Sequence, residues 1–372
     1  MNNNKINGMR HFSYPPQVAN KPTKRSFGKN KMQQQQVHPL QRDASNGNTD
    51  KTATPVNKPT QTHRRIHSNP VSTRFRDTYK VLTKIGSGSH AQVFSCEHRA
   101  TGDMRAVKIF RRSKHSDENA AILNEIEISK SLNHEYVVNI YETYVEEMFI
   151  YIVMDLMVDN LFHRVMMKQF YSEQDARSLI QQTLKAMQYL HENSIVHSDI
   201  KLDNLLLSEK GEVRLCDFSL AQRVSEEKPL TKRCGTPMYM APEVARGFPY
   251  GSASDMWSLG CAVYLMIAGY PPFMIEKSEP RSRLIRKILN AKFEFYNEEW
   301  GHVSEELKDF ISQLICLQPT RRLTAEEALK HPWITGEGMD SSVPANIHQC
   351  VITKVVEMGS QCAVEVTSQQ CC

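Results

Sequence analysis

The chain has 372 residues, of which 40% are hydrophobic, so it is long enough to bury one large or two medium cores. Its net charge of +5 conceals a division, because residues 1–77 carry 14 Lys and Arg against 3 Asp and Glu, whereas residues 78–372 carry 32 against 38. No apolar run reaches the roughly 18 residues of a membrane-spanning helix, and the first residues lack an apolar signal core. We therefore expect a cytoplasmic chain, with the nucleus as a second location, and no transmembrane segment.

Residues 1–75 are predicted to form a disordered basic extension. They are rich in Asn, Gln, Ser, Thr and Pro and have no apolar periodicity, so burial cannot offset the entropy that ordering would cost. A basic tail can bind nucleic acid or an anionic membrane, but these charges are dispersed and aromatic residues are few. A solvated tail that keeps the protein soluble or docks partners is favoured, without specific nucleic-acid binding.

Short β-rich runs begin at residue 79. Three strands are predicted at 79–85, 92–98 and 104–110, and two more within 136–144 and 149–156. Between the third and fourth strands, Ile122, Ile126 and Ile128 predict one helix over residues 116–132. A small, strand-rich lobe with one main helix is therefore expected.

The rest of the chain is predicted to be mainly helical, to about residue 334. Apolar or small residues recur at helical spacing through residues 171–193, where Ser172 and Asp175 form a capping-box start. Thr324 and Glu327 repeat this start signal later. Residues 336–372 are polar and valine-rich without a clear period, and we expect a disordered tail there.

The turn between the first two predicted strands reads IGSGSHAQVF. Gly86 and Gly88 lack the side chains that would keep backbone amides away from phosphate oxygens. Most such glycine pairs are only turns, and Ala91 stands where a GxGxxG loop has its third glycine. The loop by itself indicates nucleotide binding only weakly.

Further motifs follow in a fixed order. Lys108 lies in the third predicted strand within AVKIF, HSDIKLDN follows the capped helix, and LCDFSLAQ follows a glycine-containing turn. CGTPMYMAPE, SDMWSLGCAVYLMIAGYPPF and PTRRLTAEEALKHPW come next. With these motifs, residues 79–334 resemble the eukaryotic protein kinase family. The resemblance implies an α+β, bilobal protein kinase fold, with a small β-rich lobe and a larger helical lobe.

The same resemblance implies ATP and Mg²⁺ as cofactors and assigns roles for phosphoryl transfer. Lys108 would contact the α- and β-phosphates, held by an ion pair with Glu125 or, as the second choice, Glu127. Asp217 would bind a magnesium ion that bridges the phosphates, and Asn204 would hold a second ion. The other nucleotide contacts expected are Ile85, Gly86, Ser87, Gly88, Val93, Ala106, the gatekeeper Met154 beside the adenine, and the hinge residues Asp155 and Met157.

The resemblance also implies how a protein hydroxyl is phosphorylated. Asp199 would accept the hydroxyl proton, and Lys201 would stabilise the transferring phosphoryl group. Lys201 and Thr236 both match serine/threonine kinases, so protein Ser or Thr residues are the expected acceptors. Asp203 stands where kinases that prefer basic substrates carry an acid, which hints at Arg-directed substrates, although a solvated carboxylate is an equal alternative. Any one of these charges alone would be more typical of an ordinary surface residue.

Several positions depart from the family pattern. Ser219 replaces the glycine after Asp217 and Phe218, which should restrict the backbone there. Ser129 is polar where a large apolar residue is usual, and Ser198 replaces an arginine. None of these changes removes a charged group that handles the nucleotide or the proton. An active enzyme is therefore favoured over a catalytically silent scaffold.

The missing arginine bears on control. In the family, this arginine usually receives a phosphothreonine of the activation loop, which orders the loop. That loop is here SLAQRVSEEKPLTKRCGTP, residues 219–237. Ser198 cannot do so, and counting back two residues from Cys234 places Lys232 at the usual phosphothreonine position, with Thr231 one place earlier. We hypothesise that activity does not need activation-loop phosphorylation.

Other motifs give weaker expectations. Ser68 in RRIHSNP resembles a site that 14-3-3-type adaptors bind once it is phosphorylated, although such motifs often arise by chance. The terminal QQCC resembles lipidated tails but lacks the CaaX cysteine. The motif wording leaves two kinase groups open, the calcium/calmodulin-dependent type and the polo-like type. Two structural pairings are also expected, Glu243 with Arg322, and Asp255 with the backbone of the catalytic loop.

Overall fold

The computed structural model describes six stretches of the chain: residues 74–87, 91–113, 116–167, 171–225, 227–275 and 279–336. All of them belong to one compact unit. Some expectations concern residues that the structure does not describe. These residues are Gly88, residues 1–73 with Ser68 among them, and residues 337–372.

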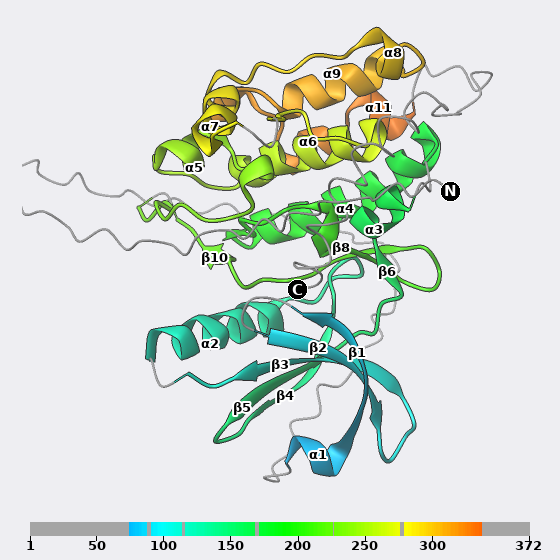
Figure 1. Cartoon of the computed structure of the whole chain (residues 1–372), viewed down its shortest axis with the longest axis vertical. Helices are drawn as coiled ribbons and strands as arrows, with labels where there is room; N and C mark the ends of the chain where they lie inside the picture. Colours follow the sequence, from blue (N-terminus) through cyan, green and yellow to red (C-terminus); the bar gives the residue numbers. More distant parts are fainter. Residues whose placement is uncertain are drawn as a thin grey trace, which may run out of the picture. The chain divides into compact units, whose positions relative to one another are not determined.

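A five-stranded antiparallel sheet forms the first lobe. Its strand order is β1-β2-β3-β5-β4. The strands are β1 (Tyr79–Ser87), β2 (Ala91–His98), β3 (Met104–Arg111), β4 (Ile140–Val145) and β5 (Phe149–Met154). Because side chains alternate across a strand, the sheet has two distinct faces. The helix α2 (Ser116–Ser131) lies against the face that is turned toward the helical lobe (Figure 1).

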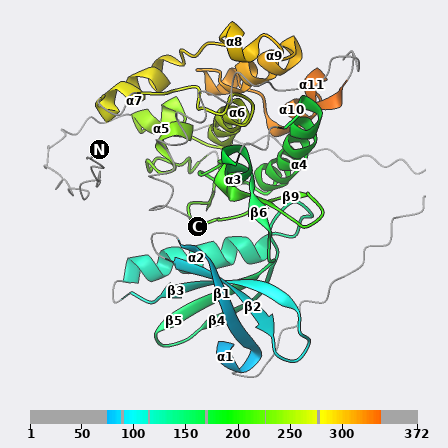
Figure 2. The ribbon, with the colours of Figure 1, turned by 45° about the vertical axis from the view of Figure 1, so that its right-hand side comes forward.

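A short helix, α1 (Phe75–Thr78), lies on the opposite, outer face of this sheet (Figures 1 and 2). The Phe75 side chain is fully buried and stacks on the ring of Tyr151, with ring centroids 4.3 Å apart. The prediction of disorder through residue 75 is therefore wrong at its end. A single aromatic residue in a polar stretch has no periodic signal, yet it completes the apolar cover of the sheet.

The predicted fourth strand began too early. The strand β4 starts at Ile140, and the preceding residues run along β9 (Val213–Leu215) of the second lobe. Val137 forms an isolated bridge with Leu215, and the N–H of Val138 donates to the Leu215 carbonyl at 2.9 Å. Both valines are buried, but by residues distant in sequence, which an apolar run cannot reveal.

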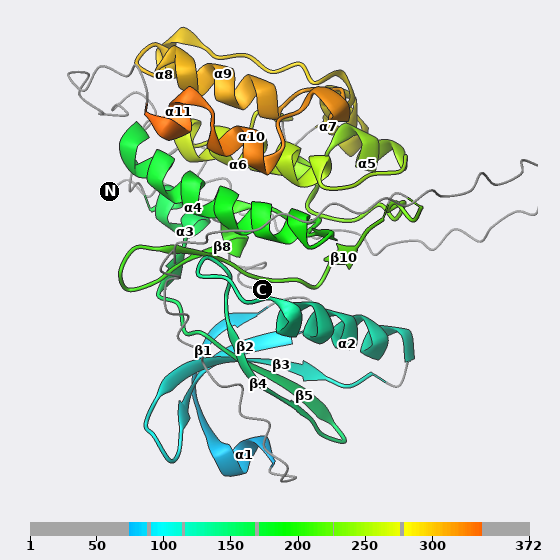
Figure 3. The same cartoon turned by 180° about the vertical axis from the view of Figure 1, so that it is seen from behind.

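The second lobe is mainly helical. Its α-helices are α3 (Leu161–Met166), α4 (Glu173–Glu192), α5 (Pro242–Arg246), α6 (Ala253–Ala268), α7 (Arg281–Asn290), α8 (Asn297–Trp300), α9 (Glu305–Leu314), α10 (Ala325–Leu329) and α11 (Pro332–Thr335). Short 3-10 helices and strands complete it: η1 (Leu202–Asn204), η2 (Pro237–Tyr239), η3 (Pro319–Arg321), β6 (Asp159–Asn160), β7 (Ile195–Val196), β8 (Leu205–Leu207) and β10 (Gln222–Arg223). The helices α10 and α11 pack on α4, and α9 packs on α6 (Figure 3).

Local signals in this lobe behave as predicted. The Ser172 hydroxyl accepts a hydrogen bond from the N–H of Asp175 at the start of α4. Thr324 and Glu327 form the reciprocal capping box of α10. The prediction of both helix starts is confirmed, because a cap depends only on residues within one turn. No helix in the described ranges is long and apolar enough to cross a bilayer.

One buried ion pair ties the far part of the helical lobe together. The guanidinium of Arg322 contacts both carboxylate oxygens of Glu243, at 2.8 and 3.3 Å. The expected pairing is confirmed. Because both side chains are buried, removing one partner would leave an uncompensated charge, so the pair constrains how α5 meets the segment before α10.

Candidate active site

Three elements bring a buried cluster of charges together between the lobes. Lys108 comes from the middle of the sheet on β3, Glu125 from α2, and Asp217 from the segment after β9. The Lys108 ammonium lies 2.7 Å from Glu125 and 2.9 Å from Asp217. Glu127, the second choice for this ion pair, is exposed. The structure therefore pairs Lys108 with Glu125.

This cluster keeps the lysine charged. Burial by itself would lower the pKa of Lys108, but the carboxylates of Asp217 and Glu125 outweigh it and raise the pKa above its ordinary value. A permanently charged ammonium held by two carboxylates is suited to binding an oxyanion. Both carboxylates contact the end of the same flexible lysine side chain, so together they limit where the ammonium can lie.

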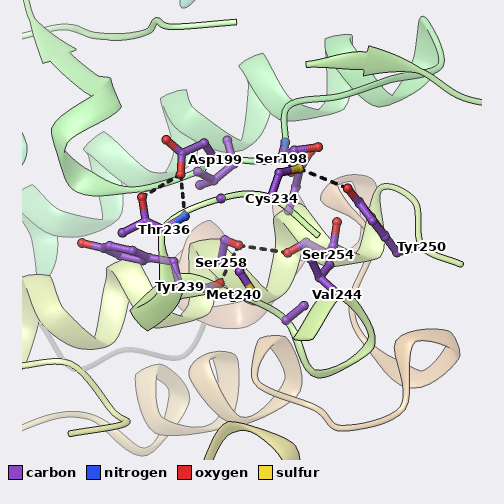
Figure 4. Close-up of a pocket in the computed structure, with 14 residues that line it drawn as sticks. Ser198, Asp199, Cys234, Thr236, Tyr239, Met240, Val244, Tyr250, Ser254 and Ser258 are labelled. Atoms are coloured by element: carbon purple, nitrogen blue, oxygen red, sulfur yellow. Dashed lines mark hydrogen bonds between the residues drawn. The ribbon is translucent and has the colours of Figure 1, made fainter. Parts of the chain in front are cut away.

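A second cluster surrounds Asp199. Its Oδ1 accepts hydrogen bonds from the N–H of Thr236 at 3.0 Å and from the Thr236 hydroxyl at 2.8 Å (Figure 4). The Lys201 ammonium lies 2.8 Å from Oδ2 and donates to the Thr236 hydroxyl at 3.2 Å. The structure thus brings the three expected catalytic residues together. The carboxylate is oriented from two sides, as a positioned proton acceptor requires.

The backbone of this loop is held by Asp255 from α6. Its carboxylate accepts the N–H groups of His197 and Ser198, each at 2.9 Å, so the expected role of Asp255 is confirmed. His197 is fully buried and its Nε2 lies 2.9 Å from the Cys216 carbonyl. These bonds connect α6, the catalytic loop and the segment that carries Asp217. The positions of Asp199 and Asp217 are therefore coupled.

Two non-glycine residues of the site adopt left-handed backbone conformations. Ser198 has φ 67° and Asp217 has φ 61°, a conformation that costs on the order of 1 kcal/mol. Gly235, with φ 96°, lies so close to the Ser198 carbonyl that a Cβ would approach it to 2.7 Å. Ser219 is not among the residues with positive φ, so serine is accommodated there without this strain.

Asn204 offers an oxygen that suits a metal ion. Its amide nitrogen donates to the Asp199 carbonyl at 2.9 Å, which directs the amide oxygen away from that bond. This Oδ1 atom is buried and has no hydrogen-bond partner within the described residues. Amide and carboxylate oxygens are the ligands that Mg²⁺ prefers, so Asn204 and Asp217 fit the expected ion.

Three of the residues expected to line a nucleotide site, Val93, Ala106 and Met154, lie on the Lys108 face of the sheet. Register pairs Val93 with Lys108 and Ala106 with Met154, so these side chains share the face of Lys108. Gly86 pairs with Val93 across β1 and β2. Ile85 on β1 is 43% exposed, and Ser87 contributes to a groove on the outer face. Gly88, as stated, lies outside the described residues.

The hinge residues differ from one another in their contacts. The Asp155 carboxylate accepts the Asn139 N–H at 3.0 Å and the Tyr141 hydroxyl at 2.7 Å, and it also pairs with Arg214. Its side chain is therefore structural, and its N–H donates to the Asn139 carbonyl at 3.1 Å, which leaves the Asp155 carbonyl for a ligand. The backbone N–H of Met157 has no hydrogen-bond partner among the described residues. An N–H without a partner can donate a hydrogen bond to an acceptor nitrogen of a planar ring such as adenine.

Tyr250 is a residue of the site that sequence reasoning missed. Its hydroxyl donates to the Lys232 carbonyl at 2.8 Å and lies 3.3 Å from the Cys234 sulfur. Ser198 lies beside it, in a cavity of about 10 Å³ (Figure 4). No local pattern marks this tyrosine, because its partners precede it by 16 and 18 residues.

Comparison with known proteins agrees with this geometry. The family profile described as "Protein kinase domain" matches residues 79–334. Calcium/calmodulin-dependent protein kinase type 1 from Caenorhabditis briggsae is 36% identical over 293 residues, which cover 77% of this chain and 80% of that protein. The protein of the same name from Caenorhabditis elegans is 37% identical over 279 residues, which cover 73% and 79%. Protein kinases in general use ATP and Mg²⁺. The chain therefore belongs to the eukaryotic protein kinase family, as a serine/threonine kinase similar to the calcium/calmodulin-dependent type.

Proposed function

We propose that the protein transfers a phosphoryl group from ATP to a protein hydroxyl, and that the Lys108 cluster binds the nucleotide phosphates while the Asp199 cluster activates the hydroxyl. Lys108 binds the phosphate oxygens, because its ammonium is buried, charged and held by Glu125 and Asp217. Val93, Ala106 and Met154 supply the apolar surface for the adenine, and the Met157 N–H donates to its ring. The geometry of the ammonium and its two carboxylates is the observation that carries this proposal.

Asp199 accepts the proton of the substrate hydroxyl. Thr236 and Lys201 already satisfy its two oxygens, so the carboxylate has a defined orientation before substrate binds. The Lys201 ammonium lies 2.8 Å from this carboxylate, so it can stabilise the negative charge of a phosphoryl group that is transferred to the hydroxyl beside Asp199. Asn204 and Asp217 hold Mg²⁺, which supplies charge neutralisation of the phosphates when it is bound.

We further propose that activity does not depend on phosphorylation of the activation loop. Leu230 and Tyr250 exchange two backbone hydrogen bonds of 3.1 and 2.9 Å, and the Tyr250 hydroxyl holds the Lys232 carbonyl at 2.8 Å. Arg233 donates to the Arg246 carbonyl, also at 2.8 Å. These bonds anchor the segment without a phosphate, and Ser198 offers no cation to receive one.

The test is phosphate transfer to a generic protein substrate by phosphatase-treated enzyme and by a Thr231→Ala variant. Both should retain the activity of untreated enzyme. Asp199→Asn serves as the inactive reference, because loss of a general base costs about a hundredfold or more. Abolished activity after either treatment would overturn phosphate independence, and undiminished activity in Asp199→Asn would overturn the assignment of the base.

An Arg-directed preference is proposed from Asp203. Its side chain is partly buried in η1, and burial raises its pKa, while the neighbouring Lys201 works in the opposite direction. A desolvated carboxylate gains more binding free energy from an ion pair with an arginine than an exposed carboxylate does.

A separate proposal concerns Ser68. That its phosphorylated form binds a 14-3-3-type adaptor rests on the sequence motif alone.

A further inference from the structure

The outer face of the sheet carries an apolar groove that the catalytic residues do not use. Its volume is about 460 Å³, and its lining includes Phe94, Ile109, Phe149 and Tyr151. Phe75 of α1 covers one part of this face, but Phe94, Ile109 and Phe149 remain only partly buried. An antiparallel sheet with one solvated face usually places polar side chains there. A face this apolar is typical of a surface that binds another segment.

The charges around the groove favour an acidic occupant. Arg76 and Arg111 belong to its lining, and none of the described lining residues is acidic, but the Glu146 carboxylate lies at the rim, where it accepts the N–H of Phe75 at 2.8 Å. In the described part of the chain, neither guanidinium forms an ion pair with a carboxylate. The Arg76 side chain hydrogen-bonds Tyr151, which uses part of its five N–H donors, so its remaining donors and Arg111 can bind an incoming carboxylate beside the apolar surface.

The two ends of the chain differ in how well they match this surface. Residues 1–73 carry 12 Lys and Arg against 2 Asp and Glu, so they would be repelled by the two arginines. Residues 337–372 carry 4 Asp and Glu against 1 Lys. Within them, residues 355–366 read VVEMGSQCAVEV, in which Glu357 lies between Val356 and Met358, and Glu365 lies between two valines. This segment combines the apolar and acidic character that the groove requires.

We propose that residues 355–366 dock in this groove, with their valines on the apolar lining and Glu357 and Glu365 at Arg76 and Arg111. The 18 residues 337–354 precede the segment, and when extended they span up to about 60 Å, well beyond the radius of gyration of about 18 Å for a folded body of about 260 residues. A tethered segment has an effective concentration on the order of millimolar, so a contact that is weak between separate molecules suffices.

Photo-crosslinking in the full-length chain tests the assignment. The photoreactive residue p-benzoylphenylalanine replaces Phe94 or, in a second variant, Phe149, both conservative aromatic changes. Mass spectrometry of the irradiated protein should find crosslinks to residues 355–366, and mixing isotopically light and heavy protein should show that they form within one chain. Crosslinks to residues 1–73, crosslinks between copies, or no crosslinks to the tail would each overturn the proposal. The same probe at Phe248, which is exposed in the helical lobe, is the matched control.

Charge reversal tests the electrostatic part. The double variant Arg76→Glu/Arg111→Glu should lower the crosslink yield severalfold, and adding Glu357→Arg and Glu365→Arg should restore it. Reversal of Lys210 and Lys292, two exposed lysines outside the groove, is the control and should leave the yield unchanged. Equal yields in all variants would overturn the pairing of tail carboxylates with these arginines. Phosphate transfer is measured alongside and should stay constant, since no catalytic group is altered.

Discussion

The carboxylates of Glu125 and Asp217 both lie within hydrogen-bond distance of the Lys108 ammonium, although Lys108 and Asp217 are 109 positions apart in the chain. Glu125 and Glu127 are two residues apart on α2, so they project about 200° apart around the helix axis. Only Glu125 is buried, and Glu127 is exposed. The position of the lysine therefore depends on the side of α2 that faces the sheet.

Replacing Glu125 should impair catalysis far more than replacing Glu127. Glu125→Gln removes the charge that holds Lys108 but keeps the shape, and misplacing a catalytic group by about 1 Å costs on the order of a hundredfold. Steady-state kinetics should show that loss in kcat/KM, whereas Glu127→Gln should show no measurable loss. Equal losses in the two variants would contradict the assigned ion pair.

Asp203 illustrates a conflict between stability and function at one residue. Burial raises its pKa, so the folded state binds the proton more tightly than the unfolded state does. Its contribution to stability is fully present below the unfolded pKa of about 3.9 and is lost as the pH rises through the raised folded pKa. At neutral pH the charged carboxylate is therefore a cost to the fold.

Asp203→Asn should then be at least as stable as the wild type at neutral pH, by urea unfolding. Its advantage should shrink as the pH approaches the ordinary Asp range. The same variant should lose on the order of tenfold in kcat/KM for an arginine-containing peptide, because a charge-assisted hydrogen bond is lost. An exposed carboxylate variant, Glu209→Gln, controls for net charge. Lower stability of Asp203→Asn at neutral pH would contradict the cost of the buried charge, and an unchanged kcat/KM for the arginine-containing peptide would contradict the Arg-directed preference.

At the scale of elements, the activation segment is anchored by bonds to neutral groups. Tyr250 follows α5 and reaches back to the Lys232 carbonyl, while Leu230 and Tyr250 pair through their backbones. Buried hydroxyls that lose a partner leave the acceptor unsatisfied, at a cost of about 1–3 kcal/mol. The hydroxyl of Tyr250 thus contributes to the order of a segment that kinases usually order by phosphorylation.

Tyr250→Phe should loosen this segment locally. Trypsin cleavage after Lys232 and Arg233 should become faster, as followed by intact mass, while the global unfolding midpoint changes little. Tyr296→Phe, a matched change at an exposed tyrosine, should leave cleavage unaffected. If the two variants were cleaved equally fast, the anchoring role of Tyr250 would be rejected.

For the whole molecule, the sheet lobe owes part of its stability to a residue that precedes the family domain. Phe75 lies four residues before position 79 and is fully buried between Tyr79 and Tyr151. An apolar sheet face needs such a cover, since its exposed area would otherwise be in water. The folded unit therefore begins earlier than the family match does.

Phe75→Ala should destabilise the folded protein by about 3–5 kcal/mol, the usual cost of truncating a buried phenylalanine. Urea unfolding followed by far-ultraviolet circular dichroism provides the measurement. Phe248→Ala, which truncates an exposed phenylalanine, is the control and should change stability little. Similar midpoints for the two variants would show that α1 adds nothing to the sheet lobe.

The sequence by itself was sufficient for the family, the two-lobed fold, the helix starts at Ser172 and Thr324, and the candidate catalytic residues, because motifs and caps depend on residues that are neighbours in the chain. The sequence favoured Glu125 over Glu127 as the partner of Lys108, and the structure confirmed it, but only the tertiary structure decided the start of β4, the cover supplied by Phe75 and the anchor supplied by Tyr250. Each of these depends on which distant residue shares a buried space, and that is settled by the packing of all the elements together.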